Sequence, residues 1–417
     1  MQKPTLSDLF RVFGRIGIFS FGGPAAQISL MHTELVDRHK WLKEQQFLGA
    51  LSFCMLLPGP EAMQLATYSG WRLHGIRGGL LAGSLFVLPG AFVILCLALG
   101  YAFYGDLPLV QSIFIGIQAA VVAIVFKALL NLSRKALNGL DSWVLALLGF
   151  AAIFVFSVPF PAIIALAALW GFLKKSGDET GSAAHVHQHV STAATLKTVA
   201  IWSVLWSMPL ILLWIADAAF LFELGVFFSK LAIVTFGGAY AVLAYMTQAV
   251  VNTHGWLTTP QMIDALGLAE TTPGPLILVT EFVGLLAGFE KGGVGLSLVA
   301  GALTLWVTFT PCFLWIFAGA PYVENILSRP RLKGALAAIS AAVVGVILNL
   351  SVWFALHVLF TSVERGTFGP VPEISSFSPV SAGFVTLASI LFLVLRLPML
   401  VVLALMAGAA AGAHFFA

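Results

Sequence analysis

Long apolar stretches dominate the pattern of hydrophobic and polar positions along the chain. Residues 78–104, 294–320 and 335–360 each run for more than twenty positions with almost no charge. Each stretch exceeds the roughly 20 residues that an α-helix needs to cross the hydrocarbon core of a bilayer. The strands of a membrane barrel would alternate in polarity instead. The pattern therefore predicts an all-α polytopic membrane protein embedded in a lipid bilayer.

Four further apolar segments are interrupted by Gly and Pro. Residues 5–37 and 220–252 break at an FGG motif, and residues 46–74 and 261–288 break at a PGP motif. We interpret each segment as a broken, re-entrant hairpin, although a pair of full crossings or one kinked helix fits the same pattern. Continuous helices are predicted near 79–104, 109–131, 143–157, 160–173, 198–219, 293–319, 335–358, 380–396 and 398–416.

The chain contains an internal repeat. At an offset of 215, residues 8–60 align with residues 223–275 without a gap, and 18 of the 53 positions are identical. The identities include FGG, WL and PGP, which a biased composition would not place at one constant offset. Beyond Pro60 the match loosens, but an LNLS motif at 130–133 and again at 348–351 indicates that the repeat continues.

Charge indicates that the two repeats have opposite orientations in the membrane. Five basic residues of the first repeat lie outside the apolar cores and have no basic counterpart at offset 215, namely Arg38, Lys40, Lys43, Arg72 and Arg77. Cytoplasmic loops carry an excess of Lys and Arg, so the loops of the first repeat and the N-terminus are predicted to be cytoplasmic. Inverted repeats around a site near the membrane midplane are a common plan of secondary transporters.

The predicted organisation has three parts. Residues 1–175 form the first repeat, residues 176–219 form a cytoplasmic linker with a connecting transmembrane helix, and residues 220–417 form the second, inverted repeat. The connecting helix makes the number of crossings between the repeats odd, which inverts the second repeat. The histidines of the run HVHQHV at 185–190 could bind a metal ion, but we prefer to interpret this run as part of a solvated linker.

Composition narrows the functional class. Only 9% of the 417 residues are charged, against about 25% in a soluble domain. Cys54, Cys96 and Cys312 stand singly and form no disulfide or metal pattern. The sequence shows no nucleotide-binding motif and no haem or flavin motif. We therefore expect no cofactor, no metal, no nucleic-acid partner and no enzymatic activity, with transport that is passive or driven by an ion gradient.

The helix breaks are candidate anion sites. A helix that restarts after a break offers unpaired N–H groups and a positive dipole end. Pro24 suits the first helical position because it has no N–H group to leave unpaired. Gln27 and Gln64 can donate further hydrogen bonds to an oxyanion. The alternative is that the small residues at the breaks only allow tight helix packing or kinks.

Two basic positions extend this candidate site. Arg15 and Lys230 are matched residues, each six positions before an FGG motif. Cations within a membrane segment are costly and usually functional, whereas snorkelling to the interface is the alternative. The complete set of predicted substrate-binding residues is Gly22, Gly23, Pro24, Gln27, Pro58, Gly59, Pro60, Gln64, Gly237, Gly238, Pro273, Gly274, Pro275, Arg15 and Lys230.

Three carboxylates near the breaks are candidates for proton coupling. Glu61 follows the first PGP motif, and Glu270 and Glu281 flank the second. An ionised carboxylate disfavours a nearby anion, but a buried carboxyl group can be neutral. For Glu61, capping of the following helix start is an equally good explanation.

At this point the motifs resemble a known family. The strings FSFGGPAAQISLMHTELVDRHKWL and LLPGPEAMQLATYSGWRLHGIRGGLLAG, repeated as VTFGGAYAVLAYMTQAVVNTHGWLT and TTPGPLILVTEFVGLLAG, closely resemble the chromate ion transporters of the CHR family, in the long, two-domain, ChrA-type form. The resemblance covers essentially the whole chain. It implies a bacterial inner-membrane protein that exports chromate and confers chromate resistance, with sulfate as a competitor of similar shape.

The family motif carries over best to the first repeat. Its residues here are Gly22, Gly23, Pro24, Gln27, Trp41, Pro58, Gly59, Pro60, Gln64 and Gly70. The second repeat departs from the motif, because Ala239, Val242 and Val279 stand at the positions of Pro24, Gln27 and Gln64 when the offset of 215 is kept. The polar part of the site is therefore predicted to lie mainly in the first repeat.

Other interpretations stay open at this stage. Helix starts and glutamines bind many oxyanions, so sulfate or another small anion is an alternative substrate, and a passive anion channel is an alternative mechanism. A membrane-embedded reductase is disfavoured because the sequence lacks a cysteine pair and an intramembrane His cluster. A homodimer is one option for the assembly state.

Overall fold

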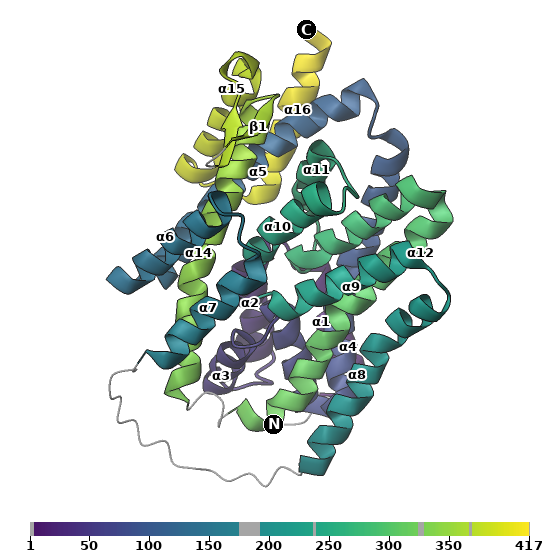
Figure 1. Ribbon diagram of the computed structural model, residues 1–417. Coiled ribbons are helices and arrows are strands. Elements are labelled where there is room, and N and C mark those ends of the chain that lie inside the picture. Colours follow the sequence, from purple (N-terminus) through teal and green to yellow (C-terminus); the bar gives the residue numbers. More distant parts are fainter. Residues whose placement is uncertain (1–3, 175–191, 237–238, 324–328, 367–368, 417) are drawn as a thin grey trace. The chain divides into compact units, whose positions relative to one another are not determined.

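The computed structural model describes residues 4–174, 192–236, 239–323, 329–366 and 369–416. Within these residues the chain is helical apart from short turns, loops and one antiparallel hairpin of two strands, which the apolar pattern did not predict (Figure 1). The predominance of helices follows from the apolar composition, since a helix satisfies its own backbone hydrogen bonds in lipid.

The elements follow the predicted order closely. The first part contains α1 (Leu6–Phe19), α2 (Gly23–His32), α3 (Glu44–Cys54), α4 (Glu61–Tyr104), α5 (Pro108–Ala136), α6 (Leu140–Phe154) and α7 (Phe160–Leu173). The remainder contains α8 (Thr192–Ile215), α9 (Ala219–Val234), α10 (Ala239–Gln248), α11 (Thr259–Thr271), α12 (Val279–Gly319), α14 (Pro330–Leu359), β1 (Val363–Gly366), β2 (Gly369–Pro372), α15 (Pro379–Ser389) and α16 (Met399–Phe416).

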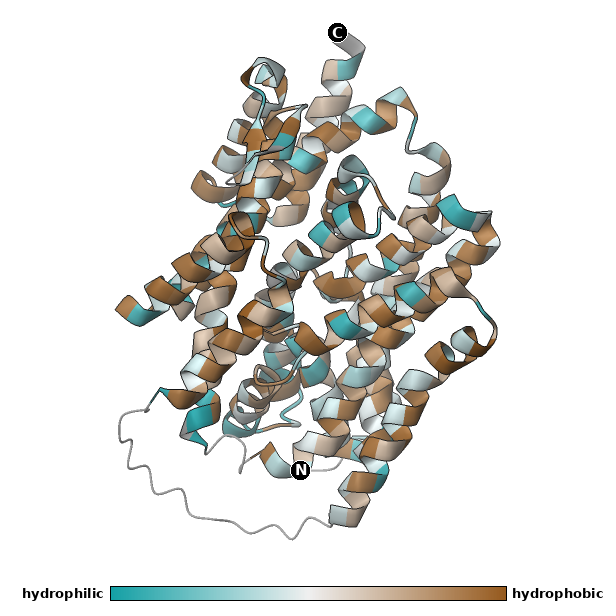
Figure 2. Ribbon diagram, viewed as in Figure 1, coloured by the Kyte–Doolittle hydropathy of each residue, from teal (hydrophilic) through white to brown (hydrophobic). Residues whose placement is uncertain are grey.

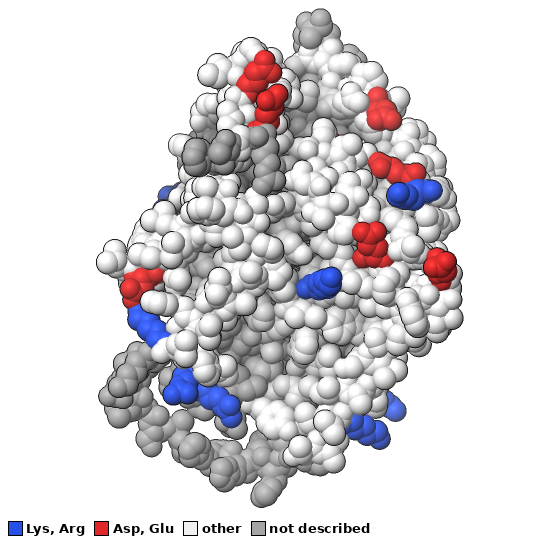
Figure 3. All heavy atoms as spheres, in the orientation of Figure 1, with Lys and Arg blue, Asp and Glu red and all other residues white. Residues whose placement is uncertain are grey.

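Several helices suit a bilayer by length and composition. Among the described residues, five are long and apolar enough to cross a membrane: Glu61–Tyr104, Pro108–Ala136, Thr192–Ile215, Leu276–Tyr322 and Arg331–Leu359. Four shorter apolar helices accompany them. Apolar residues line most of the helices (Figure 2), and charged groups are sparse on the face drawn in Figure 3. The chain is therefore a multi-pass membrane protein.

The chain divides into two compact units, and each takes segments from both predicted repeats. Unit 1 consists of Met1–Cys96, Leu173–Ala239 and Thr272–Gly334, and unit 2 consists of Leu97–Phe172, Tyr240–Thr271 and Ala335–Ala417. In unit 1, α12 packs against α8 and α9. In unit 2, α5 packs against α11, α15 and α16.

Local structure repeats at the offset found in the sequence. Both α1 and α9 end just before an FGG motif; α2 begins at the last glycine of the first motif, and α10 begins directly after the second motif. Each of these second helices runs into a short π-helical turn, Thr33–Arg38 in one repeat and Ala249–Thr253 in the other. The correspondence of these elements extends the sequence match to backbone conformation.

The helices after the PGP motifs turn back on themselves. Within α4, Gly75 has φ 62° and ψ −152°, a conformation that strongly favours glycine. The backbones of Gly70 and Gly78 then touch, so the stretches on either side of the turn pack antiparallel. The same turn occurs in α12, where Gly293 has φ 69° and ψ −162°.

The two turns are 218 residues apart rather than 215. The first PGP motif leads directly into α4, whereas a three-residue 3₁₀ turn, Leu276–Leu278, separates the second motif from α12. The counterparts assigned at offset 215 beyond Pro60 were therefore wrong by three residues. At the offset of 218, Gln64 corresponds to Phe282 and Arg72 corresponds to Glu290. Arg72 therefore still has no basic counterpart in the second repeat.

Candidate functional site

The first FGG motif is a break between α1 and α2. Gly22 has φ 89° and caps α2, and Gly23 has φ 78° and begins it. Both values lie in the left-handed region that glycine tolerates best. Pro24 stands in the first turn of α2, as the sequence predicted, where its missing N–H costs no hydrogen bond. Gly237 and Gly238 of the second motif lie outside the described residues.

The PGP motifs also depend on glycine. Gly59 has φ 120° and Gly274 has φ 87°. A Cβ atom at Gly59 would lie 2.8 Å from Nε2 of Gln64 and 2.9 Å from Sγ of Cys312. Pro60 immediately precedes the first residue of α4, and Pro275 precedes the 3₁₀ turn before α12. Both motifs therefore hold a backbone conformation that a larger residue would disturb.

Within unit 1, the motifs of the two repeats are joined reciprocally. The Gly59 N–H group donates to the Thr235 carbonyl oxygen at 2.8 Å, and the Gly274 N–H group donates to the Ser20 carbonyl oxygen at 2.9 Å. Ser20 and Thr235 are the matched residues just before the two FGG motifs. We call these two hydrogen bonds the reciprocal clasp.

The two glutamines of the predicted site are buried, and their amide nitrogens are occupied. Nε2 of Gln27 donates to the carbonyl oxygens of Gly274 at 2.6 Å and Ser20 at 3.3 Å. Nε2 of Gln64 donates to the Pro58 carbonyl oxygen at 2.7 Å. The Oε1 atoms of both glutamines have no hydrogen-bond partner within the described residues. In this conformation the glutamines therefore support the breaks rather than present donors to a ligand.

A small cavity marks the place where these segments meet. Its volume is about 10 Å³, and it is lined by Pro24, Gln27, Pro60, Glu61, Ala62, Thr235, Pro275, Leu276 and Ile277. A cavity of this size is at the lower limit for a single water molecule. The cavity is thus too small to hold an oxyanion.

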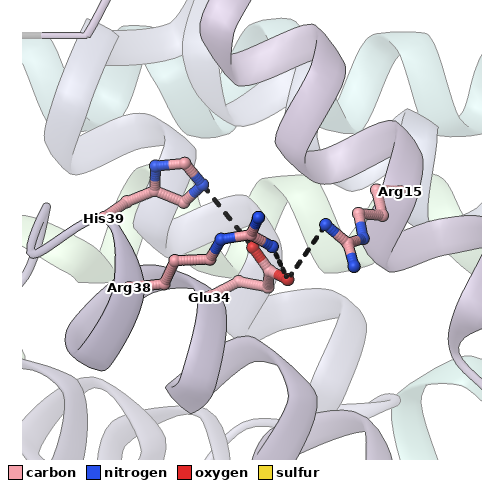
Figure 4. Close-up of polar contacts among 4 residues, drawn as sticks. All are labelled: Arg15, Glu34, Arg38 and His39. Carbon is pink, nitrogen blue, oxygen red and sulfur yellow. Dashed lines mark hydrogen bonds and ion pairs between the residues drawn. The ribbon is translucent and has the colours of Figure 1, made fainter.

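Arg15 is engaged by a carboxylate near the first break. Its guanidinium lies 3.8 Å from Oε1 of Glu34, which also pairs with Arg38 at 3.2 Å and His39 at 3.5 Å (Figure 4). The Glu34 side chain is 6% exposed, whereas that of Arg15 is 54% exposed. Lys230, the counterpart of Arg15, is exposed, and Ala249 stands where Glu34 would be. The two basic positions thus have different surroundings.

The three candidate carboxylates have distinct environments. Glu61 begins α4 and lines the small cavity. Glu281 is buried in the first turn of α12, and its Oε2 atom has no hydrogen-bond partner in the part of the chain that the structure describes. Glu270 belongs to unit 2, where its Oε1 atom accepts a hydrogen bond from the Tyr240 hydroxyl at 2.8 Å. Only Glu61 and Glu281 share unit 1 with the breaks.

Sequence reasoning missed the part that Ser20 and Thr235 play. Both are buried, both supply a carbonyl to the reciprocal clasp, and the Ser20 hydroxyl has no hydrogen-bond partner among the residues that the structure describes. A weak signal was available, because a hydroxyl residue precedes FGG in both repeats. A hydroxyl residue at this position does not predict the contact, because the hydrogen bond uses the backbone carbonyl oxygen and not the side chain.

Unit 2 contains a second cavity of about 180 Å³. Its polar lining comes from Ser157, Thr247, Gln248, Asn252, Asn349, His357 and Glu364. Asn349 of the second LNLS motif therefore faces a cavity. Among the described residues no cluster of His, Cys, Asp and Glu could hold a metal ion. The HVHQHV run lies outside the described residues.

These features define a multi-pass membrane protein whose helices are broken at paired glycine and proline motifs. A family model described as chromate transporter matches residues 7–172 and 222–413. The chain belongs to the chromate transporter family. This is a family of transporters and not of enzymes, as the names of its members state.

Individual relatives support this assignment. A chromate transport protein of Cupriavidus metallidurans is 31% identical over 82% of this chain and 81% of its own length. A chromate transport protein of Pseudomonas aeruginosa is 31% identical over 82% of this chain and 79% of its own length. An uncharacterized transporter of Bacillus subtilis is 30% identical over 37% of this chain and 78% of its own length. No solved structure matches the chain.

Proposed function

We propose that this protein is a secondary active transporter that exports chromate from the bacterial cytoplasm and thereby confers chromate resistance. The observation that carries the proposal is membership of the chromate transporter family over both halves of the chain. The paired helix breaks supply a physical basis, because backbone N–H groups at helix starts favour tetrahedral anions. The proposed location is the inner membrane, with the N-terminus in the cytoplasm.

The architecture that fits this function is a pair of inverted repeats. Three observations support it: the repeated elements, the loss of basic residues in the second repeat, and the reciprocal clasp. A Bacillus subtilis relative that matches over only 156 residues supports the idea that one repeat is an ancestral unit. In this proposal 1–175 and 220–417 are the repeats, joined by 176–219.

The substrate site in this proposal is formed by the FGG and PGP breaks in unit 1. Opening would separate the segments around the small cavity and release Nε2 of Gln27 from the Gly274 carbonyl oxygen. The freed amide and the N–H groups at the start of α2 and α4 would then surround the oxyanion. Opening would also break the two hydrogen bonds of the reciprocal clasp, and closure would form them again. The substrate would therefore be exposed while these bonds are broken and occluded while they are formed.

Proton coupling completes the proposal. A buried carboxyl group without a positive partner is costly when ionised, and it can therefore hold a proton. Among the described residues, Glu281 beside the second PGP motif is such a group, while Glu61 lines the small cavity and Glu270 accepts a hydrogen bond from Tyr240. Release and uptake of a proton by these groups would drive accumulation of the anion.

The deciding experiment measures uptake of labelled chromate into everted membrane vesicles. We expect saturable uptake against a chromate gradient, with competition by sulfate and little by phosphate. Vesicles from cells without the protein are the control. Uptake no greater than in the control vesicles would reject the function. Labelled sulfate uptake that exceeds chromate uptake would identify sulfate as the main substrate, and dissipation of a gradient without accumulation would identify a channel.

A further inference from the structure

Unit 2 contains a buried carboxylate that the proposed site does not include. Asp264 lies on α11 and is 5% exposed. Its Oδ2 atom accepts a hydrogen bond from the Tyr101 hydroxyl at 2.8 Å, and its Oδ1 atom accepts one from Nε2 of Gln118 at 2.6 Å. Three helices of unit 2, namely the end of α4, α5 and α11, thus converge on one carboxyl group.

Close packing holds these groups in place. A Cβ atom at Gly267, one turn after Asp264, would overlap the side chain of Ile117, so α11 and α5 approach closely there. Ile117 precedes Gln118 on α5, which brings the amide to the carboxylate. The Tyr101 ring packs edge-on against Phe114 of α5, with centroids 5.2 Å apart.

The Asp264 carboxylate has no basic partner among the described residues. Within the described part of the chain, no ion pair involves Asp264. Two side chains from neighbouring helices contact the Asp264 carboxylate. Tyr101 comes from α4, and Gln118, which does not titrate, comes from α5. Lys127 of α5 lies over the Phe392 ring instead, 3.8 Å from its centroid. An ionised carboxylate that is buried without a cation is destabilising, so binding of a proton by Asp264 would relieve that cost.

The hydrogen bonds allow a proton to be gained without loss of a contact. The Gln118 amide nitrogen can only donate, so Oδ1 stays an acceptor in both states. A tyrosine hydroxyl can donate or accept. When Oδ2 gains a proton from water, it donates to the Tyr101 oxygen, and the Tyr101 O–H group rotates away. The cluster therefore satisfies both the ionised and the protonated carboxyl group.

A second pair of the same kind lies on the same helix. Tyr240 donates to Glu270, six residues after Asp264, which is about 9 Å along a helix axis. We propose that Asp264, held by Tyr101 and Gln118, is a proton-binding site of the transport cycle that works in series with Glu270. This inference rests on the proposed proton-coupled transport of chromate and adds to it a residue that no sequence motif marks.

The test uses the whole purified protein in liposomes and the variant Asp264→Asn. Asparagine imitates the protonated state, because its oxygen accepts from Gln118 and its NH₂ group donates to the Tyr101 oxygen. Two rates of labelled chromate movement are compared: exchange at equal chromate on both sides, and accumulation driven by an imposed pH gradient. We expect the variant to keep exchange and to lose accumulation. Asp106→Asn changes an exposed aspartate in the turn after α4; it is the matched control and should keep both activities.

The outcomes separate this inference from the proposed function. Wild-type protein that moves no chromate rejects the function, and wild-type protein that ignores the pH gradient rejects proton coupling altogether. If the pH gradient drives the same chromate accumulation in Asp264→Asn as in the wild type, the assignment of Asp264 as a proton-binding site is overturned, while the proposed function stands. If Asp264→Asn loses both chromate exchange and chromate accumulation, Asp264 has a structural role, and its assignment as a proton-binding site is also overturned.

A second variant probes the tyrosine. Tyr101→Phe removes the group that exchanges donor and acceptor roles but keeps the packing against Phe114. We expect the pH profile of chromate exchange to be displaced from that of the wild type, while the profile of Tyr104→Phe, an exposed tyrosine one turn later, stays in place. Identical profiles for Tyr101→Phe and the wild type would contradict the proposed proton site.

Discussion

The N–H group of Gly59 donates a hydrogen bond to the carbonyl oxygen of Thr235 at 2.8 Å, and the matched residues Gly274 and Ser20 form the same bond in reverse. Broken helices leave backbone groups unpaired, and such groups are costly where water is scarce. The reciprocal clasp pairs the free groups of one repeat with those of the other. Each repeat therefore completes the break of its partner.

Substitution of Gly59 tests this arrangement. We expect Gly59→Ala to lower the thermal unfolding temperature in detergent and to reduce chromate transport. The alanine would be held in a conformation that costs about 1–3 kcal/mol, and its Cβ atom would press on Gln64 and Cys312. Gly14→Ala is the matched control, since Gly14 lies within α1 and has open space around it. A Gly59→Ala protein as stable and active as the control would contradict the role given to Gly59.

Gln27 provides a second prediction. Gln27→Ala removes the hydrogen bond to the Gly274 carbonyl oxygen and leaves that buried acceptor unpaired, at a cost of about 1–3 kcal/mol. We expect a lower unfolding temperature and a higher KM for chromate, because the same amide is proposed to bind the substrate after opening. Gln111→Ala, on the exposed surface of α5, should change neither quantity. An unchanged KM with reduced stability would restrict Gln27 to a structural role.

The ion pairs of Glu34 give a third prediction. Arg15 is half exposed and 3.8 Å from Glu34, so a double-mutant cycle with Arg15→Gln and Glu34→Gln should give a coupling energy below about 1 kcal/mol. Arg38 is closer, at 3.2 Å, and its coupling to Glu34 should be the larger of the two. Thermal unfolding in detergent measures both. A higher KM for chromate in Arg15→Gln but not in Arg38→Gln would support the predicted contact of Arg15 with the substrate.

The opposite orientation of the repeats is tested by labelling matched positions. Lys43 and Thr258 both precede a helix, α3 and α11 respectively, and they correspond at offset 215. In a background without the three natural cysteines, Lys43→Cys should react with a membrane-impermeant maleimide only after the cells are permeabilised. Thr258→Cys should react in intact spheroplasts. Labelling of both positions from the same side would rule out inverted repeats.

Much of the local structure could be predicted from the sequence. Apolar length determines which segments can cross a bilayer, and Gly and Pro determine where a helix must stop. The predicted break at FGGP and the restart at Pro24 therefore agree with α1 and α2. The β-hairpin of Val363–Pro372 escaped prediction because four-residue strands give almost no periodic signal.

The register of the second repeat shows where such reasoning stops. The offset of 215 does not hold past the second PGP motif, because a 3₁₀ turn at Leu276–Leu278 adds three residues there. Apolar residues match one another at many offsets, so the insertion is hard to see next to the PGP motif, although the two LNLS motifs at 130–133 and 348–351 already lie 218 positions apart. The equivalent glycine turns at Gly75 and Gly293 reveal it, because both have the same unusual backbone angles.

The sequence by itself determined the class of this protein, its duplication and the positions of its four helix breaks, because these depend on local apolar length and on the backbone preferences of Gly and Pro. Only the tertiary structure decided which groups complete those breaks. The reciprocal clasp and the cluster around Asp264 join residues more than 140 positions apart. Such contacts depend on how helices pack, and one Asp among apolar neighbours gives no sign of the Tyr and Gln that will surround it.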